Sequence, residues 1–324
     1  MLLAGLFVGL AVLSKYTSVY LWLGSGFFIV LYRRTWFKKP ALYISVFISL
    51  VLILPIGLWN FKNDFISFTF HSSRIGFFEA GLRPDFFFTE LLGQFFYNNP
   101  VNFVLIVIAL IAIAKGKNFI YADIKKLLLL WALPLIATFL FFSLFRRTLP
   151  HWSGPAYISL ILIAATHMAT KSDKGRLIPL SVKMSLLILL LVLVSGFSQI
   201  RYGLIDFSKL GMDDVTADMY GWSQLKEKIE PVFYEDVSSG AMGADAPIIA
   251  RKWFPAAHLD YYVATPLKRN LLAVNDLHEI HKYAWINAKR PFIQEGGNAY
   301  YISTSIHYRH PDDFYKGMFE ETLG

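Results

Sequence analysis

The chain has 324 residues, of which 55% are hydrophobic and 17% are charged, and its mean hydropathy is +0.46. Because a soluble globular domain usually carries about a quarter charged residues, this composition argues against a protein that is soluble throughout. The formal net charge of +8 predicts no nucleic-acid partner, since the lysines and arginines gather in short loops between apolar runs. The chain has no cysteine, which excludes disulfide bonds and cysteine metal sites.

Nearly all the long apolar runs lie in residues 1–200, whereas residues 201–324 have the composition of an ordinary globular domain. We therefore predict an all-α polytopic membrane domain followed by a small α/β soluble domain. The apolar segments are residues 2–13, 17–32, 41–58, 101–114, 127–145, 153–169 and 180–199. A helix needs roughly 20 residues to cross a bilayer, so several of the seven predicted spans require flanking residues.

The opening stretch MLLAGLFVGLAVLSKYT has neither a positively charged start nor a cleavage site, so we predict no signal peptide. It ends at Lys15, and the short SKYTS sequence leaves the first two segments as either two short helices or one broken helix. Two interpretations of Lys15 are open. Its ammonium group either reaches the lipid headgroups or holds an anion such as a lipid-linked phosphate, with hydroxyl contacts from Tyr16 and Thr17.

The loops between the segments differ in positive charge. Residues 33–39, 115–126 and 171–183 each contain four lysines or arginines, whereas the loops at 14–18 and 146–152 contain one and two. Excess positive charge marks the cytoplasmic side of a membrane protein, and every loop fits one alternation.

This alternation predicts a multi-pass membrane protein. Lys15, the long segment 59–100, the turn at 146–152 and residues 201–324 are predicted to lie outside the cytoplasm. Membrane lipids are therefore predicted partners.

The segment 59–100 is rich in phenylalanine but too polar to span a membrane. Within it, residues 85–99 place apolar side chains at helical spacing beside Glu90 and Gln94. We predict an amphipathic helix in the outer interface, with Pro100 opening the next span.

Three carboxylates of this segment, those of Asp64, Glu79 and Glu90, have the chemistry of a general base, but none belongs to a recognisable acid–base pair. We predict surface or helix-capping roles for them. His71 and Arg74 lie three residues apart and share a face if the stretch is helical. They either contact a carrier phosphate or pack in the interface.

The RRTLPHW turn places two arginines on the side where positive charge is disfavoured. Arg146, Arg147, His151 and Trp152 form a patch suited to phosphate binding and to stacking on a sugar ring. The alternative is membrane anchoring by Trp152 with headgroup contacts from the arginines.

The C-terminal region mixes predicted strands and helices, which indicates a small α/β domain. Helices are predicted in 220–233 and in the second half of 246–263, and strands in the first half of 246–263, in 270–276 and in 299–306. His258, His278 and His281 lack metal-ligand spacing, so no metal site is predicted.

Five stretches occur in one order along the chain: GLFVGLAVLSKYT, LPIGLWNFKNDFISFTFH, LGQFFYNNP, PHWSGPAY and ADMYGWSQL. Together they resemble bacterial integral-membrane glycosyltransferases of the GT-C class. The resemblance covers roughly residues 1–290. It is closest to the group related to dolichyl-phosphate-mannose protein mannosyltransferases and to enzymes that add sugars to lipopolysaccharide or lipid A.

The resemblance implies an enzyme of the bacterial inner (cytoplasmic) membrane that moves a sugar from a polyprenyl-phosphate donor to a lipid, glycan or protein acceptor at the outer face of this membrane. It implies inversion by direct displacement, with an aspartate of the first outer loop as general base. Lys15 matches a family position near the donor phosphate, and the PHW stretch matches an outer-loop element beside the active-site cavity. No cofactor is implied, and the requirement for a divalent metal is left open.

Family members carry a span and an acidic outer loop before the LSKYT region, which here starts near residue 5. The catalytic residue is therefore expected upstream of Met1, and the chain is expected to be the C-terminal portion of the enzyme. A misassigned start or a second polypeptide are the alternatives.

Two other functions compete with this one. A transporter or flippase component for lipid-linked sugars would carry ionisable residues near the middle of its spans, where only Lys15 and His167 stand out here. A non-catalytic cell-envelope assembly protein would use its C-terminal domain to bind a partner.

Overall fold

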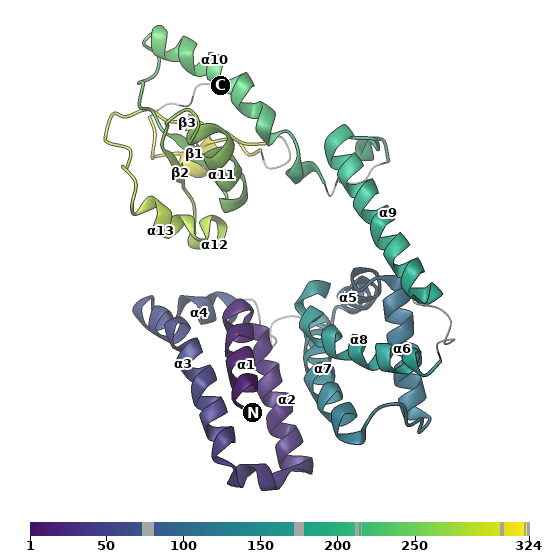
Figure 1. The fold of residues 1–324 in the computed structure, drawn as a ribbon. Helices are drawn as coiled ribbons and strands as arrows, with labels where there is room; N and C mark the ends of the chain where they lie inside the picture. The colour runs from purple at the N-terminus through teal and green to yellow at the C-terminus, as the bar shows by residue number, and fades with distance from the viewer. Residues whose placement is uncertain are drawn as a thin grey trace. The chain divides into compact units, whose positions relative to one another are not determined.

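The computed structural model describes residues 1–72, 81–171, 178–210, 214, 216–304, 308–320 and 322. The chain is mostly helical and divides into two compact units, Met1–Leu193 and Val194–Gly324, which are drawn from purple to yellow along the chain in Figure 1.

The first unit consists mainly of helices. They are α1 (Leu2–Ser14), α2 (Val19–Tyr32), α3 (Pro40–Lys62), α4 (Ile66–Ser72), α5 (Pro84–Tyr97), α6 (Pro100–Ala114), α7 (Ala122–Ser143), α8 (Gly154–Ala169) and the larger part of α9 (Leu180–Tyr202). The turns η1 (Tyr16–Ser18), η2 (Arg34–Lys38) and η3 (Pro150–Trp152) are short 3₁₀ helices. Each of the seven predicted apolar segments is therefore a helix, and the first two are separate helices.

Not every helix is long enough to cross a membrane alone. In the described part of the chain α3, α7 and α9 have the length and composition of spans, and α5 with α6 adds a fourth if this pair, bent by 103°, counts as one span. The helices α1, α2 and α8 are apolar but shorter. Seven full spans thus remain a prediction.

Small residues let α1 and α3 pack closely, as they run side by side in Figure 1. Gly5 and Gly9 of α1 face Ser45 and Ser49 of α3, and a Cβ atom on Gly5 would lie 2.1 Å from the Ser45 carbonyl oxygen. This is the small-xxx-small pattern by which membrane helices approach each other in the absence of a hydrophobic driving force. The Ser45 hydroxyl also donates to the Met1 carbonyl at 2.9 Å.

Hydrogen bonds between helices join α2 to its neighbours. The Trp22 indole donates to the Ser49 hydroxyl of α3, and the Tyr20 hydroxyl donates to Thr138 of α7, each at 2.9 Å. Buried side chains of α6, α7 and α8 form one apolar core, against which Tyr20 of α2 also packs. These contacts fix the ends of α1, α7 and α8, which carry the candidate site.

Two of the positively charged loops meet at one end of this bundle. Arg33, which follows α2, forms an ion pair with Asp123 at the start of α7, and the Lys126 ammonium lies 4.2 Å from the centre of the Tyr32 ring. The shared end agrees with the predicted loop alternation. The side of the membrane that it faces stays a prediction.

The second unit contains a small parallel sheet. Its elements are η4 (Phe207–Leu210), η5 (Ala217–Met219), α10 (Trp222–Ser238), β1 (Ile248–Ala250), α11 (Trp253–Leu259), the π-helical turn η6 (Asp260–Ala264), β2 (Leu271–Ala273), α12 (Leu277–Ile280), α13 (Tyr283–Asn287), β3 (Tyr300–Tyr301) and α14 (Asp312–Tyr315). The strand order is β2-β1-β3, with Ile249 paired to Leu272 and Tyr301. The predicted strands and helices are confirmed, although the strands are only two or three residues long.

Alternate strand residues enter two separate cores. Ile248 and Leu271 belong to the larger core with α10 and α11, whereas Ile249 and Leu272 pack with Tyr315 of α14. Both faces of the sheet are therefore covered, which accounts for the continuous apolar runs in these strands.

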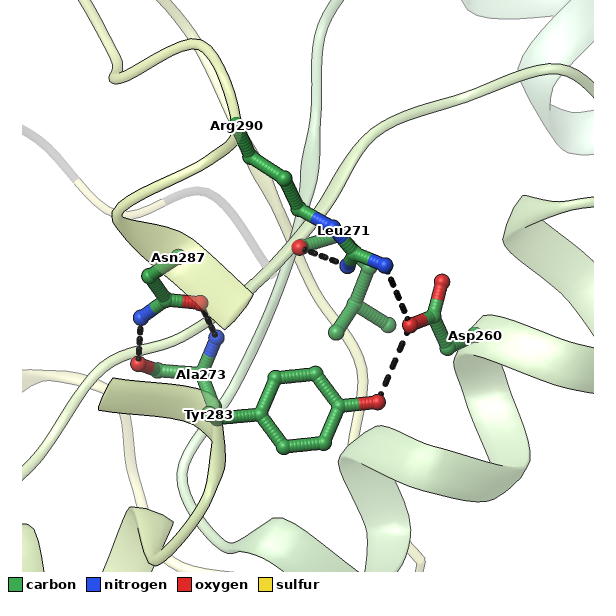
Figure 2. A network of polar contacts seen from close by, with 6 residues as sticks. All are labelled: Asp260, Leu271, Ala273, Tyr283, Asn287 and Arg290. Atoms are coloured by element: carbon green, nitrogen blue, oxygen red, sulfur yellow. Dashed lines mark hydrogen bonds and ion pairs between the residues drawn. The ribbon is translucent and has the colours of Figure 1, made fainter. Parts of the chain in front are cut away.

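Polar contacts close the free edge of β2 (Figure 2). The Asn287 side chain donates to the carbonyl of Ala273 at 2.7 Å and accepts from its amide at 3.3 Å, in place of a neighbouring strand. Beside it, Arg290 and the Tyr283 hydroxyl both donate to Asp260 Oδ2, at 2.7 and 3.0 Å. Burial and the Asp260 carboxylate raise the pKa of Tyr283 above its ordinary value, which keeps the hydroxyl a donor.

Candidate functional site

Lys15 lies at a break between two helices. Its backbone is extended (φ −155°, ψ 123°), so α1 ends there and η1 begins at Tyr16. The Lys15 Nζ atom donates to the backbone carbonyl oxygen of His151 at 2.9 Å. This bond joins two sequence-predicted site stretches, LSKYT and PHW, that lie 136 residues apart.

The aromatic rings of η3 pack against α5 and α7. The ring centre of His151 lies 6.0 Å from that of Tyr97, and the ring centre of Trp152 lies 5.6 Å from that of Phe139. His151 is exposed and Trp152 is half-buried. Trp152 thus holds the turn in place, while the His151 side chain remains accessible.

Glu90 is buried, which corrects the prediction of a surface or capping role. Its side chain is 1% exposed, and its two carboxylate oxygens accept from the Thr148 hydroxyl at 2.9 Å and from the Gln94 amide at 3.0 Å. Gln94 in turn accepts from the Tyr157 hydroxyl at 2.6 Å. The network connects α5 and α8 to the RRTLPHW turn through its Thr148.

The helix α5 is predicted correctly, but its polar face points inward. Glu90 and Gln94 are each 1% exposed, whereas Phe88, Leu92 and Phe96 are 59%, 59% and 68% exposed. A helix surrounded by lipid places its apolar side outward and its polar side toward the protein interior, the reverse of a helix in water.

Gly93 brings η3 close to α5. A Cβ atom on Gly93 would lie 2.3 Å from Pro150 Cγ, so only glycine lets the proline ring rest on this helix. The turn is thereby fixed from two sides, by Pro150 on Gly93 and by Thr148 on Glu90.

The remaining predicted residues have different outcomes. Arg146 is half-buried, and its amide donates to the Phe142 carbonyl at 3.0 Å, whereas Arg147 is exposed. Tyr16 is 44% exposed beside Lys15. Arg74 and the side chain of His71 lie outside the described residues, so their predicted phosphate contact stays a prediction.

Sequence reasoning missed Gln94, Thr148 and Tyr157 as parts of the site. The signal was the four-residue spacing of Glu90 and Gln94 on an otherwise apolar helix, because polar residues in membrane helices face the bundle interior.

Two histidines of the second unit lie against aromatic rings. His258 lies 4.6 Å from Trp222 and 4.5 Å from Phe254 between ring centres, and His281 stacks on Trp253 at 5.3 Å. Within the residues that the structure describes, no group of three His, Asp or Glu side chains could hold a metal ion.

Comparison with known proteins finds a family match at the start of the chain. Residues 1–59 match the family of dolichyl-phosphate-mannose-protein mannosyltransferases. The match contains α1, Lys15, α2 and most of α3, which confirms the resemblance drawn from the sequence. Together with the helices of spanning length, it indicates an integral membrane protein.

A weaker similarity to a second protein covers more of the chain. The chain is 22% identical over 181 residues to the lipid A galacturonosyltransferase RgtD of Rhizobium johnstonii. The aligned region covers 56% of this chain and 38% of that protein. No solved structure matches the chain.

Proposed function

We propose that the chain acts in a glycosyltransferase that moves a sugar from a polyprenyl-phosphate donor to a lipid, glycan or protein acceptor. Transfer takes place at the outer face of the cytoplasmic membrane, and the alternation of loop charge supports an orientation with Lys15 and the 146–152 turn on that side. The family match over residues 1–59 and the similarity to a lipid A galacturonosyltransferase support this class of reaction.

The contact between Lys15 Nζ and the His151 carbonyl carries the proposal. It joins the LSKYT stretch, which resembles a family element near the donor phosphate, to the PHW stretch, which resembles an outer-loop element beside the active-site cavity. A lysine ammonium has three N–H donors, and the His151 carbonyl takes one of them. The remaining donors are available for phosphate oxygens.

Lys15 stabilises the departing polyprenyl phosphate. Displacement at the sugar carbon breaks its bond to the phosphate oxygen, and negative charge develops on that oxygen as the acceptor hydroxyl attacks. A fixed cation beside this oxygen stabilises the transition state more than the ground state. The exposed Arg147 lies on the same turn as His151 and adds positive charge there.

Glu90 positions the turn and does not act as the general base. Both of its carboxylate oxygens accept hydrogen bonds within the protein, and its side chain is 1% exposed. A general base must reach the proton that it removes, directly or through one water.

Replacing Lys15 by alanine in the complete enzyme is expected to lower sugar transfer about 10- to 100-fold, the equivalent of one hydrogen bond to a charged group. Lys15→Arg should retain part of the activity, because it keeps the charge. The measurement is the rate at which labelled sugar passes from a polyprenyl-phosphate donor to acceptor in membranes.

Lys62→Ala is the matched control, because Lys62 is an exposed lysine in the last turn of α3. Its transfer rate should equal that of the wild type. An unchanged transfer rate in Lys15→Ala would show that Lys15 does not bind the donor phosphate. Movement of the donor across the membrane without transfer to acceptor would favour a transporter instead.

A further inference from the structure

A pocket with both basic and apolar lining residues lies at the far end of α8. It has a volume of about 460 Å³ and lies between the end of α6, the turn that follows it, and the last residues of α8. Because α8 begins next to η3 and has 16 residues, this pocket is about 24 Å from the His151 end. It is therefore separate from the Lys15 site.

Three lysines line the pocket. Lys115 and Lys117 follow α6, and Lys171 follows α8. Among the residues that the structure describes, none of the three forms an ion pair with a carboxylate. Their positive charge is thus available to an anion.

A buried histidine, His167, forms part of the inner wall of the pocket. His167 is 7% exposed, and its ring centre lies 4.7 Å from that of Phe119. Its ring nitrogens have no hydrogen-bond partner in the described part of the chain. The pocket therefore offers an imidazole, the Asn118 amide and three ammonium groups to one ligand.

The other wall is apolar and opens toward lipid. Ile108 and Ile111 of α6 line the pocket, and they are 43% and 48% exposed on the surface of the helix bundle. A ligand that fills the pocket would thus have a charged group near Lys115 and a hydrocarbon part along α6. This is the chemistry of an amphiphile, and a free inorganic anion would leave the isoleucine wall uncovered.

We propose that this pocket binds an anionic phospholipid, with the headgroup phosphate held by Lys115, Lys117 and Lys171 and one acyl chain lying along Ile108 and Ile111. Basic pockets between membrane helices bind phospholipid headgroups in this way. The site requires no part of the glycosyltransferase proposal.

The test is native mass spectrometry of the full chain in detergent micelles titrated with phosphatidylglycerol. In the triple variant Lys115→Gln, Lys117→Gln, Lys171→Gln, binding is expected to weaken roughly 10- to 100-fold, from the attraction of each lysine to an anionic headgroup. The matched control replaces three lysines that do not line the pocket, Lys38, Lys39 and Lys125, by glutamine. That variant should bind the lipid as the wild type does.

Two further measurements on the wild-type chain need no variant. Phosphatidylglycerol should raise the melting temperature more than phosphatidylcholine does, and inorganic phosphate should not displace the bound lipid. Equal binding by the two triple variants, or equal effects of the two lipids, would overturn the proposal. Complete displacement by inorganic phosphate would also overturn it and assign the pocket to a free anion.

Discussion

Replacing Glu90 by leucine is expected to lower the free energy of unfolding of the first unit by about 2–5 kcal/mol. Leucine fills a similar volume but accepts no hydrogen bond. The Thr148 hydroxyl and the Gln94 amide, both buried, then lose their acceptors. A thermal melt in detergent micelles should show a melting temperature lower by roughly 5–15 °C.

The Glu90→Gln variant removes the negative charge of residue 90 but keeps groups that can form both hydrogen bonds. A glutamine oxygen can accept from Gln94 while its amide donates to the Thr148 hydroxyl, so this variant should lose about 1 kcal/mol or less. In the Glu90→Leu background, Thr148→Val should restore part of the stability, because the unpaired hydroxyl is removed. A Glu90→Leu protein as stable as the wild type would show that the network does not hold the turn.

The second large effect concerns the contact between α1 and α3. Gly5→Leu should cost about 3 kcal/mol or more, because its Cβ would lie 2.1 Å from the backbone carbonyl oxygen of Ser45, which cannot move aside as a side chain can. Separation of the two helices also displaces Lys15, which follows α1 directly. The melting temperature and the transfer rate should therefore fall together.

Gly26→Leu provides the comparison. Gly26 lies in α2, and nothing lies within 4 Å of the position of its Cβ atom. Since leucine favours helix over glycine, this variant should be as stable as the wild type or slightly more stable. Equal melting temperatures for the Gly5 and Gly26 variants would disprove close packing through Gly5.

Helices α1 to α3 and α6 to α9 could be predicted from the sequence because each contains a long apolar run, and such runs in a membrane protein form helices to satisfy their own backbone hydrogen bonds. The strand β1 was predictable because Ile248 and Ile249 are adjacent β-branched residues, a local pattern that is typical of strands whatever the rest of the fold. Local patterns therefore gave most of the secondary structure.

The site was only partly predictable. Lys15 and His151 were each selected by the chemistry of their residue types and by the family resemblance, but no local pattern sets the hydrogen bond between positions so far apart. Glu90 was misassigned because its spacing with Gln94 defines a polar face without saying which side of the helix meets water. The surrounding lipid decides that direction, and only the packing of α5 on η3 and α7 reveals it.

The most direct test of the central claim is cross-linking between positions 15 and 151 from outside the cell. The chain has no cysteine, so in Lys15→Cys, His151→Cys the introduced thiols are the only ones. A short, membrane-impermeant bifunctional thiol reagent added to intact cells should join them, whereas the pair Lys15→Cys, Lys38→Cys should remain unlinked. Failure of the first pair to link in intact cells, with linking only after the membrane is opened, would place Lys15 on the cytoplasmic side and contradict the account.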